Sequence, residues 1–185
     1  MRWLPVLLTL IATPAAANES VGCQDIWFTR NLVMDRAGYC FATPLGQALF
    51  DNSDCTGKSV SIDALGSRLV SQIQALEKQH GCAVNTRRTR LDLDDLRIRR
   101  QLRDLPVFDE FPGGCLGWTA GREPLYAGRD SGSKVIGRIE PGDYVSFTHL
   151  PVDGWSYVTV SEPGWGALKS GGWMSGETHC KDFAG

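Results

Sequence analysis

The chain lacks a dominant sign of charge. Its 185 residues include 19 Lys and Arg against 21 Asp and Glu, which gives a formal net charge of −2. A balance this even provides no general attraction for the phosphates of nucleic acid. After the N-terminal leader there is also no apolar run of the roughly 20 residues that a membrane-spanning helix needs. We therefore expect no nucleic-acid partner and no transmembrane span in the mature chain.

Catalytic and metal-binding patterns are scarce as well. The sequence has only three histidines, His80, His149 and His179, and none of them sits in a serine or cysteine nucleophile motif. It contains no His-Glu-x-x-His, no Gly-x-Ser-x-Gly and no phosphate-binding loop. His80 precedes Gly81 at a predicted helix C-terminus, where a cation interacts favourably with the helix dipole. The sequence therefore names no catalytic residue, no cofactor and no metal ligand, and we favour a protein without catalysis.

The first 17 residues have the order of a secretory signal peptide. Arg2 precedes a short apolar run, and the small residues Ala15-Ala16-Ala17 follow it. A positive start, an apolar centre and an Ala-x-Ala site are the parts of such a peptide. We expect cleavage near Ala17 and a periplasmic or secreted product. A membrane-anchored protein with an uncleaved leader is the alternative.

All the cysteines follow this leader, and their number is even, as in proteins with disulfides in an oxidising compartment. The four in the first half allow three pairings. Zinc binding is the alternative, but the sequence has no Cys-x-x-Cys pair and its cysteine spacings are long. We favour three bridges: Cys40 with Cys55, Cys23 with Cys82, and Cys115 with Cys180.

Three helices are predicted in the first half, which we take as a domain over residues 18–84. The first covers residues 24–37 and ends at Gly38, and the second starts at Thr43-Pro44, a capping residue followed by a proline of the first turn. The third begins at Ser61 and ends at Gly81. It carries an apolar stripe at helical spacing, formed by Ile62, Leu65, Leu69, Ile73 and Leu76.

A charge-dense connector over residues 85–112 follows. Its arginines are nearly balanced by acids, so a solvated face whose charges pair with one another is favoured over a site for an anion. Its apolar residues fall on one face of a helix, which makes a docked amphipathic helix plausible: Leu91, Ile98, Leu102 and Leu105.

The second half, residues 113–185, reads as a small antiparallel barrel, which makes the fold class α+β. Short alternating runs are separated by turn residues such as Asp153-Gly154. Five strands are predicted, over residues 124–127, 134–139, 144–149, 155–160 and 172–174.

The second half resembles the bacterial SH3-like domain. Residues 134–145 read Lys-Val-Ile-Gly-Arg-Ile-Glu-Pro-Gly-Asp-Tyr-Val, and the segments Gly154-Trp155-Ser156-Tyr157-Val158 and Gly172-Trp173-Met174 follow in the order of that family. The resemblance spans residues 122–176 and implies an SH3-like β-barrel. Two departures are a loop over residues 128–133 without Gly-Pro-Gly and a longer stretch over residues 161–171 that contains Trp165.

The first half is similar to the YARHG-type domain of bacterial extracytoplasmic proteins over residues 23–82. The resemblance rests on the segment 23–31, Cys-Gln-Asp-Ile-Trp-Phe-Thr-Arg-Asn, and on Gly38-Tyr39-Cys40-Phe41. Of the pentapeptide that names the family only Arg36 and Gly38 are present, and Ala37 stands in place of the histidine. Any catalytic role of that histidine therefore cannot apply here, and the family implies no defined activity.

Binding has better candidates than catalysis. Aromatic faces stack on sugar rings and peptides, and the predicted barrel carries Trp155, Tyr157, Trp165 and Trp173. Packing in the core is favoured for Trp155 and Trp173, whereas Trp165 in its glycine-rich insertion is the best candidate for an exposed contact. Arg30 and Asn31 in the first half read either as a ligand-binding pair or as a structural hydrogen-bonding pair, with the structural reading slightly favoured.

We therefore expect a non-catalytic envelope-binding module that recognises peptidoglycan or another cell-wall component. This expectation depends chiefly on the two resemblances, while the sequence itself contributes export, disulfides and an aromatic surface. One alternative is a small cell-wall hydrolase with an unrecognised carboxylate in the first half. Another is an interaction or inhibitor module that docks an exported protein.

Overall fold

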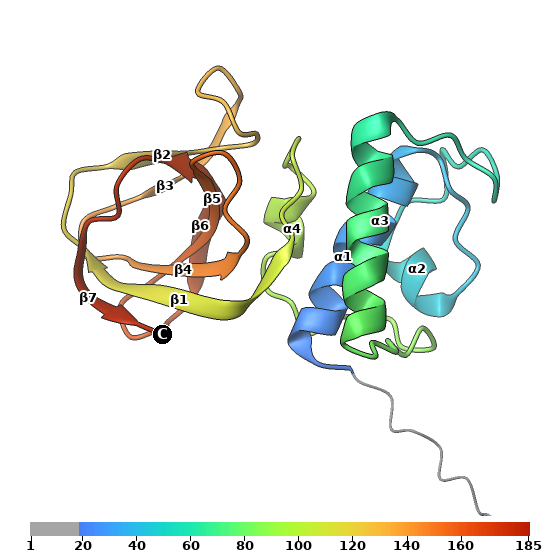
Figure 1. Ribbon diagram of the computed structural model, residues 1–185, viewed down its shortest axis with the longest axis horizontal. Coiled ribbons are helices and arrows are strands. Elements are labelled where there is room, and N and C mark those ends of the chain that lie inside the picture. The colour runs from blue at the N-terminus through green and yellow to red at the C-terminus, as the bar shows by residue number, and fades with distance from the viewer. Residues whose placement is uncertain (1–18) are drawn as a thin grey trace, which may run out of the picture.

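The computed structural model describes residues 19–185, so the predicted signal peptide lies outside the described residues. A helical half and a sheet half lie side by side, with a short helix between them (Figure 1). Among the described residues no helix is long and apolar enough to cross a membrane.

The helical half contains α1 (Val21–Arg36), α2 (Pro44–Leu49) and α3 (Ala64–Gln79). The side chains of Ser20 and Thr43 cap the first two helices by accepting backbone N–H groups. The predicted start of the third helix at Ser61 is wrong, because Asp63 is the N-cap and accepts from the Gly66 N–H group. The core of this half is rich in aromatic rings and contains Trp27, Phe28, Leu32, Phe41, Leu45, Phe50 and Leu91.

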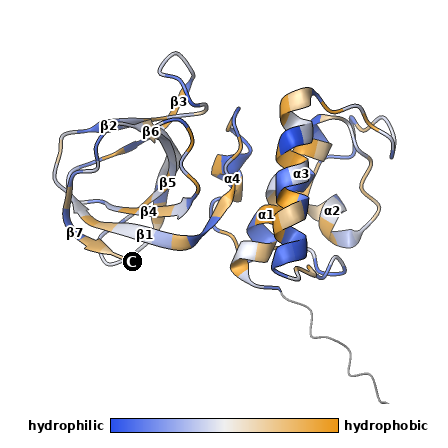
Figure 2. Cartoon of the chain, viewed as in Figure 1, coloured by the Kyte–Doolittle hydropathy of each residue, from blue (hydrophilic) through white to orange (hydrophobic). Residues whose placement is uncertain are grey.

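The predicted apolar stripe of α3 is buried only in part. Ile73 is fully buried, whereas Leu65 is exposed near the start of the helix. Both hydrophobic and hydrophilic residues occur along the length of α3 (Figure 2). The helix therefore packs on α1 through one face, from Gly66 beside Val33 to Glu77 beside Arg30, while Leu65 points away from this contact.

The sheet half is one antiparallel sheet of seven strands in the order β3-β2-β6-β5-β4-β1-β7. It is antiparallel as predicted and curls around its own core (Figure 1), but β3 and β7 remain edges, so the sheet is not a closed barrel. Five strands lie where the sequence predicts them, although β6 is longer, and β1 and β7 were not predicted. The strands are β1 (Phe108–Trp118), β2 (Glu123–Tyr126), β3 (Val135–Ile139), β4 (Tyr144–His149), β5 (Trp155–Ser161), β6 (Leu168–Ser175) and β7 (Cys180–Ala184).

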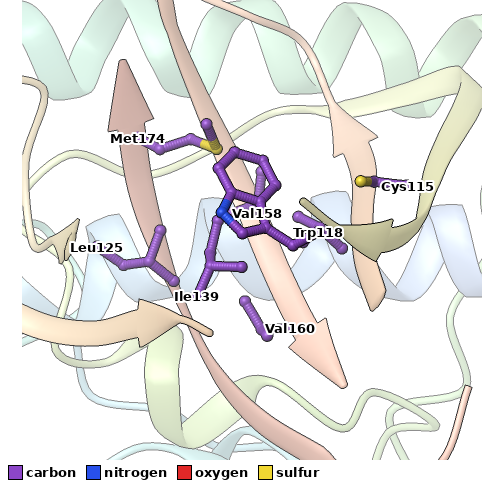
Figure 3. Close-up of a cluster of buried hydrophobic side chains, with 8 residues drawn as sticks. Cys115, Trp118, Leu125, Ile139, Val158, Val160 and Met174 are labelled. Atoms are coloured by element: carbon purple, nitrogen blue, oxygen red, sulfur yellow. The ribbon is translucent and has the colours of Figure 1, made fainter. Parts of the chain in front are cut away.

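The concave side of the sheet holds the core of this half. Trp118, Leu125, Ile139 and Met174 point toward one another (Figure 3) and are almost completely buried. The predicted turn between β4 and β5 is a two-residue hairpin in which Asp153 and Gly154 both have positive φ, 51° and 79°. This is the geometry for which Asp-Gly is favoured.

The connector forms only one helical turn, α4 (Leu96–Arg99), in place of a long amphipathic helix. Of the predicted apolar face, Leu91, Ile98 and Leu102 are nevertheless buried, and Leu105 is partly buried. Ile98 and Leu102 pack on Tyr157 and Trp173 of the sheet half, whereas Leu91 joins the core of the helical half. The connector therefore lies between the two halves and contacts both.

Three disulfides cross-link the chain, with the pairings that the sequence favours: Cys23–Cys82, Cys40–Cys55 and Cys115–Cys180. The described residues contain no free cysteine and no cluster of side chains suited to a metal ion. The first two bridges lie within the helical half and the third joins β1 to β7. Each stabilises the fold by roughly 2 to 4 kcal/mol, chiefly by restricting the unfolded chain.

Candidate functional site

Trp165 lies in a tight loop between β5 and β6. Hydrogen bonds from the Glu162 N–H to the Ala167 carbonyl and from the Gly166 N–H to the Glu162 carbonyl, both 3.1 Å, close the loop. Trp165 has φ 57°, and Gly164 before it has φ 76°. The left-handed region is costly for a bulky side chain, so this loop holds the tryptophan in a conformation that the residue itself disfavours.

The indole ring of Trp165 rests on the sheet at Gly114. A Cβ atom at Gly114 would lie 2.8 Å from Cη2 of the ring, so only glycine allows this contact. The Tyr144 ring meets the indole edge to face, with centroids 5.2 Å apart. Despite these contacts Trp165 is 48% exposed, so one face is supported and the rest is open to solvent.

Beside the indole is an open hollow of about 280 Å³. Phe111 and Phe183, which directly precede residues of its lining in the sequence, are 84% and 68% exposed. We call the lining the Trp165 surface; it consists of Pro112, Gly113, Gly114, Ser146, Trp165, Ala184 and Gly185. An aromatic wall above a floor of small residues suits a flat apolar face, such as that of a sugar ring or of a peptide side chain. Exposed apolar patches of this kind mark interaction sites.

The other predicted aromatic contacts lie elsewhere. Tyr157 and Trp173 are fully buried, so neither ring is presented to a ligand at the surface; for Trp173 this is the core packing that the sequence favours. They pack against the connector, where Trp173 Nε1 donates to the Asp104 carbonyl at 2.7 Å. Trp155 is half-buried and meets the Tyr126 ring edge to face.

Arg30 and Asn31 both have partners within the helical half. The Arg30 guanidinium donates to both carboxylate oxygens of Glu77 at 3.0 to 3.1 Å, which ties α1 to α3. Asn31 is buried, and its Nδ2 donates to the Trp27 carbonyl at 2.7 Å. Neither residue belongs to the Trp165 surface, and the contacts of both fit the structural interpretation.

A buried polar network between the two halves was not predicted. Arg99 of α4 is fully buried and donates to both carboxylate oxygens of Asp25 in α1, at 2.7 and 3.0 Å. Arg99 also donates to Thr29 Oγ1, and His149 Nε2 of β4 lies 3.1 Å from Asp25 Oδ2. We call Asp25, Thr29, Arg99 and His149 the inter-half network. It overturns the solvated, self-paired interpretation of the connector for Arg99, although Arg88 does pair with an acid at the surface.

Electrostatics stabilise the charged forms of Asp25 and Arg99. Burial by itself raises the pKa of Asp25, but the positive charge of Arg99 and the contact with His149 outweigh it and hold that pKa below its usual value. Nearby, burial and the negative charge of Asp95 raise the pKa of Tyr157 well above its usual range, and the Tyr157 hydroxyl donates to Asp95 at 2.9 Å. None of these groups lines the hollow beside Trp165, and their contacts join α1, α4 and the sheet half.

The fold therefore defines an α+β protein, stapled by three disulfides, with one exposed aromatic surface on an open antiparallel sheet. Residues 81–185, more than half of the chain, match the model of a domain of unknown function (DUF4453), and the chain belongs to this family. Residues 3–78 match the YARHG domain, which confirms the resemblance of the first half. No curated protein and no solved structure gives a significant match.

Proposed function

We propose that this protein is a non-catalytic envelope-binding module that recognises peptidoglycan or another cell-wall component through the Trp165 surface. The observation that carries the proposal is the half-exposed indole of Trp165, held in a left-handed conformation above a floor of small residues. Strained backbone persists where the surrounding structure enforces it and is frequent at binding sites. Sugar rings have apolar faces that stack on such an indole.

The proposal includes export to the periplasm or the cell exterior after cleavage near Ala17. Three disulfides support it, because they are typical of oxidising compartments. We also propose that residues 122–176 derive from an SH3-like domain. In that view β1 and β7 are additions at one edge, and they supply most of the floor of the Trp165 surface.

The hydrolase alternative has one observation in its favour. Burial, followed by the negative charges of Asp54 and Asp51, raises the pKa of Asp35 in the helical half, and a general acid needs such a carboxyl group. Asp35 does not line the hollow beside Trp165, however. Release of soluble fragments from peptidoglycan by the wild type, lost in Asp35→Asn, would favour hydrolysis over binding.

Co-sedimentation of the mature, oxidised protein with purified peptidoglycan tests the binding proposal. Three proteins are compared: the wild type, Trp165→Ala, and Leu65→Ala as the matched control, since Leu65 is an exposed apolar residue of α3. We expect saturable pelleting of the wild type and of the control. Loss of a central tryptophan contact typically costs about 2 kcal/mol of binding free energy, so the affinity of Trp165→Ala should fall about 30-fold.

Two outcomes contradict the proposal. If Trp165→Ala pellets as well as the wild type, the Trp165 surface is not the contact. If the wild type stays in the supernatant, the wall-binding function falls. Capture of one defined exported protein, lost in Trp165→Ala, would then support the interaction or inhibitor alternative.

A further inference from the structure

A second hollow lies where the helical half meets the sheet half. It is a partly enclosed cavity of about 90 Å³ between the start of α1, the end of α3 and β1. Its walls are mostly apolar and include Ile26, Leu76 and Phe108, with Ser20 among the polar residues of the lining. Gly22 is required for this arrangement, because a Cβ atom there would lie 2.6 Å from the Phe108 ring.

A polar pair also lines this cavity. His80 Nε2, at the end of α3, lies 2.6 Å from Glu110 Oε1 of β1. The Glu110 side chain is half-exposed, so its carboxylate faces solvent as well as the cavity. A ligand with an apolar body inside could therefore donate a hydrogen bond to this carboxylate.

The volume limits the size of such a ligand. A water molecule occupies about 30 Å³ in the liquid, and a cavity of about 150 Å³ binds benzene. The apolar walls disfavour a charged group inside the cavity.

We propose that this cavity binds a small neutral molecule with a branched aliphatic body of about four or five heavy atoms and one hydroxyl group. The hydroxyl donates to the Glu110 carboxylate, and the body fills the space between Ile26, Leu76 and Phe108. This site is separate from the Trp165 surface and does not depend on it.

Isobutanol is the probe that we would use, titrated into the mature, oxidised protein and followed by amide chemical shifts. Isobutyrate, which has the same branched body with a negative charge, is the control ligand. We expect saturable shifts at Gly22 and Ile26 with a dissociation constant of the order of 1 mM, and no saturable binding of isobutyrate. Glu110→Ala should weaken the binding of isobutanol about 3- to 10-fold, because one hydrogen bond is lost.

Two variants test where the probe binds. Ile26→Phe fills the cavity and should abolish the shifts, whereas Leu65→Phe adds the same ring to an exposed position of α3 and should leave them unchanged. If Ile26→Phe does not fold, Leu76→Phe is used as the cavity-filling variant instead. No saturable shift in the wild type, equal shifts in a folded filled variant, or equal binding of isobutyrate would each overturn the proposal.

Discussion

Replacement of Arg99 by methionine should destabilise the whole protein. Methionine keeps much of the volume of the side chain but removes the two hydrogen bonds to the Asp25 carboxylate and the one to Thr29. Asp25 would stay buried with His149 as its remaining partner in this network. Breaking a buried ion pair in this way costs about 3 to 5 kcal/mol of unfolding free energy.

Urea denaturation of the oxidised protein at pH 7 measures this effect. With a urea dependence of about 2 kcal/mol per molar, the midpoint should fall by about 1.5 to 2.5 M. Arg88→Met is the matched control, because Arg88 pairs with Asp92 at the surface, and its midpoint should move far less. The double variant Asp25→Leu/Arg99→Met should lose less stability than the sum of the two single variants. A loss below about 1 kcal/mol in Arg99→Met would refute the reasoning, since that is the size of an ordinary substitution.

Three further predictions follow from named contacts. The pKa of Asp25 is lowered in the folded state, so its contribution to stability is present above the usual aspartate pKa of about 3.9 and is lost as the pH falls below it. The urea midpoint, measured between pH 6 and pH 2.5, should therefore fall with the pH. In Asp25→Asn the dependence of this midpoint on pH should be weaker. The Cys115–Cys180 bridge closes a sequence separation of 65 residues, so alanine at both positions should cost about 4 kcal/mol in the same assay, and an unchanged midpoint would contradict this. Gly114→Ala should displace the Trp165 ring, which a shift in tryptophan emission and weaker peptidoglycan pelleting would report, whereas wild-type emission and pelleting would argue against the contact.

The helices and the disulfides could be predicted because their determinants are local or countable. Thr43-Pro44 fixes the start of α2, and the glycines at positions 38 and 81, which have positive φ, follow α1 and α3 closely. The two missed strands have physical reasons of their own. β1 contains Pro112-Gly113-Gly114, which reads as a boundary, and the register of its pairing with β4 shifts between Phe108 and Gly113. β7 is a short edge strand with mostly exposed side chains, so it lacks the alternation that marks a half-buried strand.

The inter-half network could not be predicted because its members are far apart in the chain. Asp25 and Arg99 are separated by 74 residues, and the arginines and acids around Arg99 suggest local pairing instead. One indication that Arg99 is buried is its place between Ile98 and Leu102, whose side chains are buried against the sheet half. The position of Trp165 in an insertion predicted its exposure, whereas the left-handed backbone and the contact with Gly114 required the fold.

The inter-half network also limits how far the sheet half can move relative to the helical half. Arg99 and His149 belong to the part that matches DUF4453, and Asp25 and Thr29 to the part that matches YARHG. A small shift of one part against the other that breaks the Arg99–Asp25 pair while both groups stay buried would be costly, because each charge would lose its partner without gaining water. Relative motion of the halves is therefore opposed by the same pair that stabilises them. If a ligand binds at Trp165 as proposed, the position of the helical half relative to that ligand, including the loop closed by Cys40–Cys55, is then set by this joint.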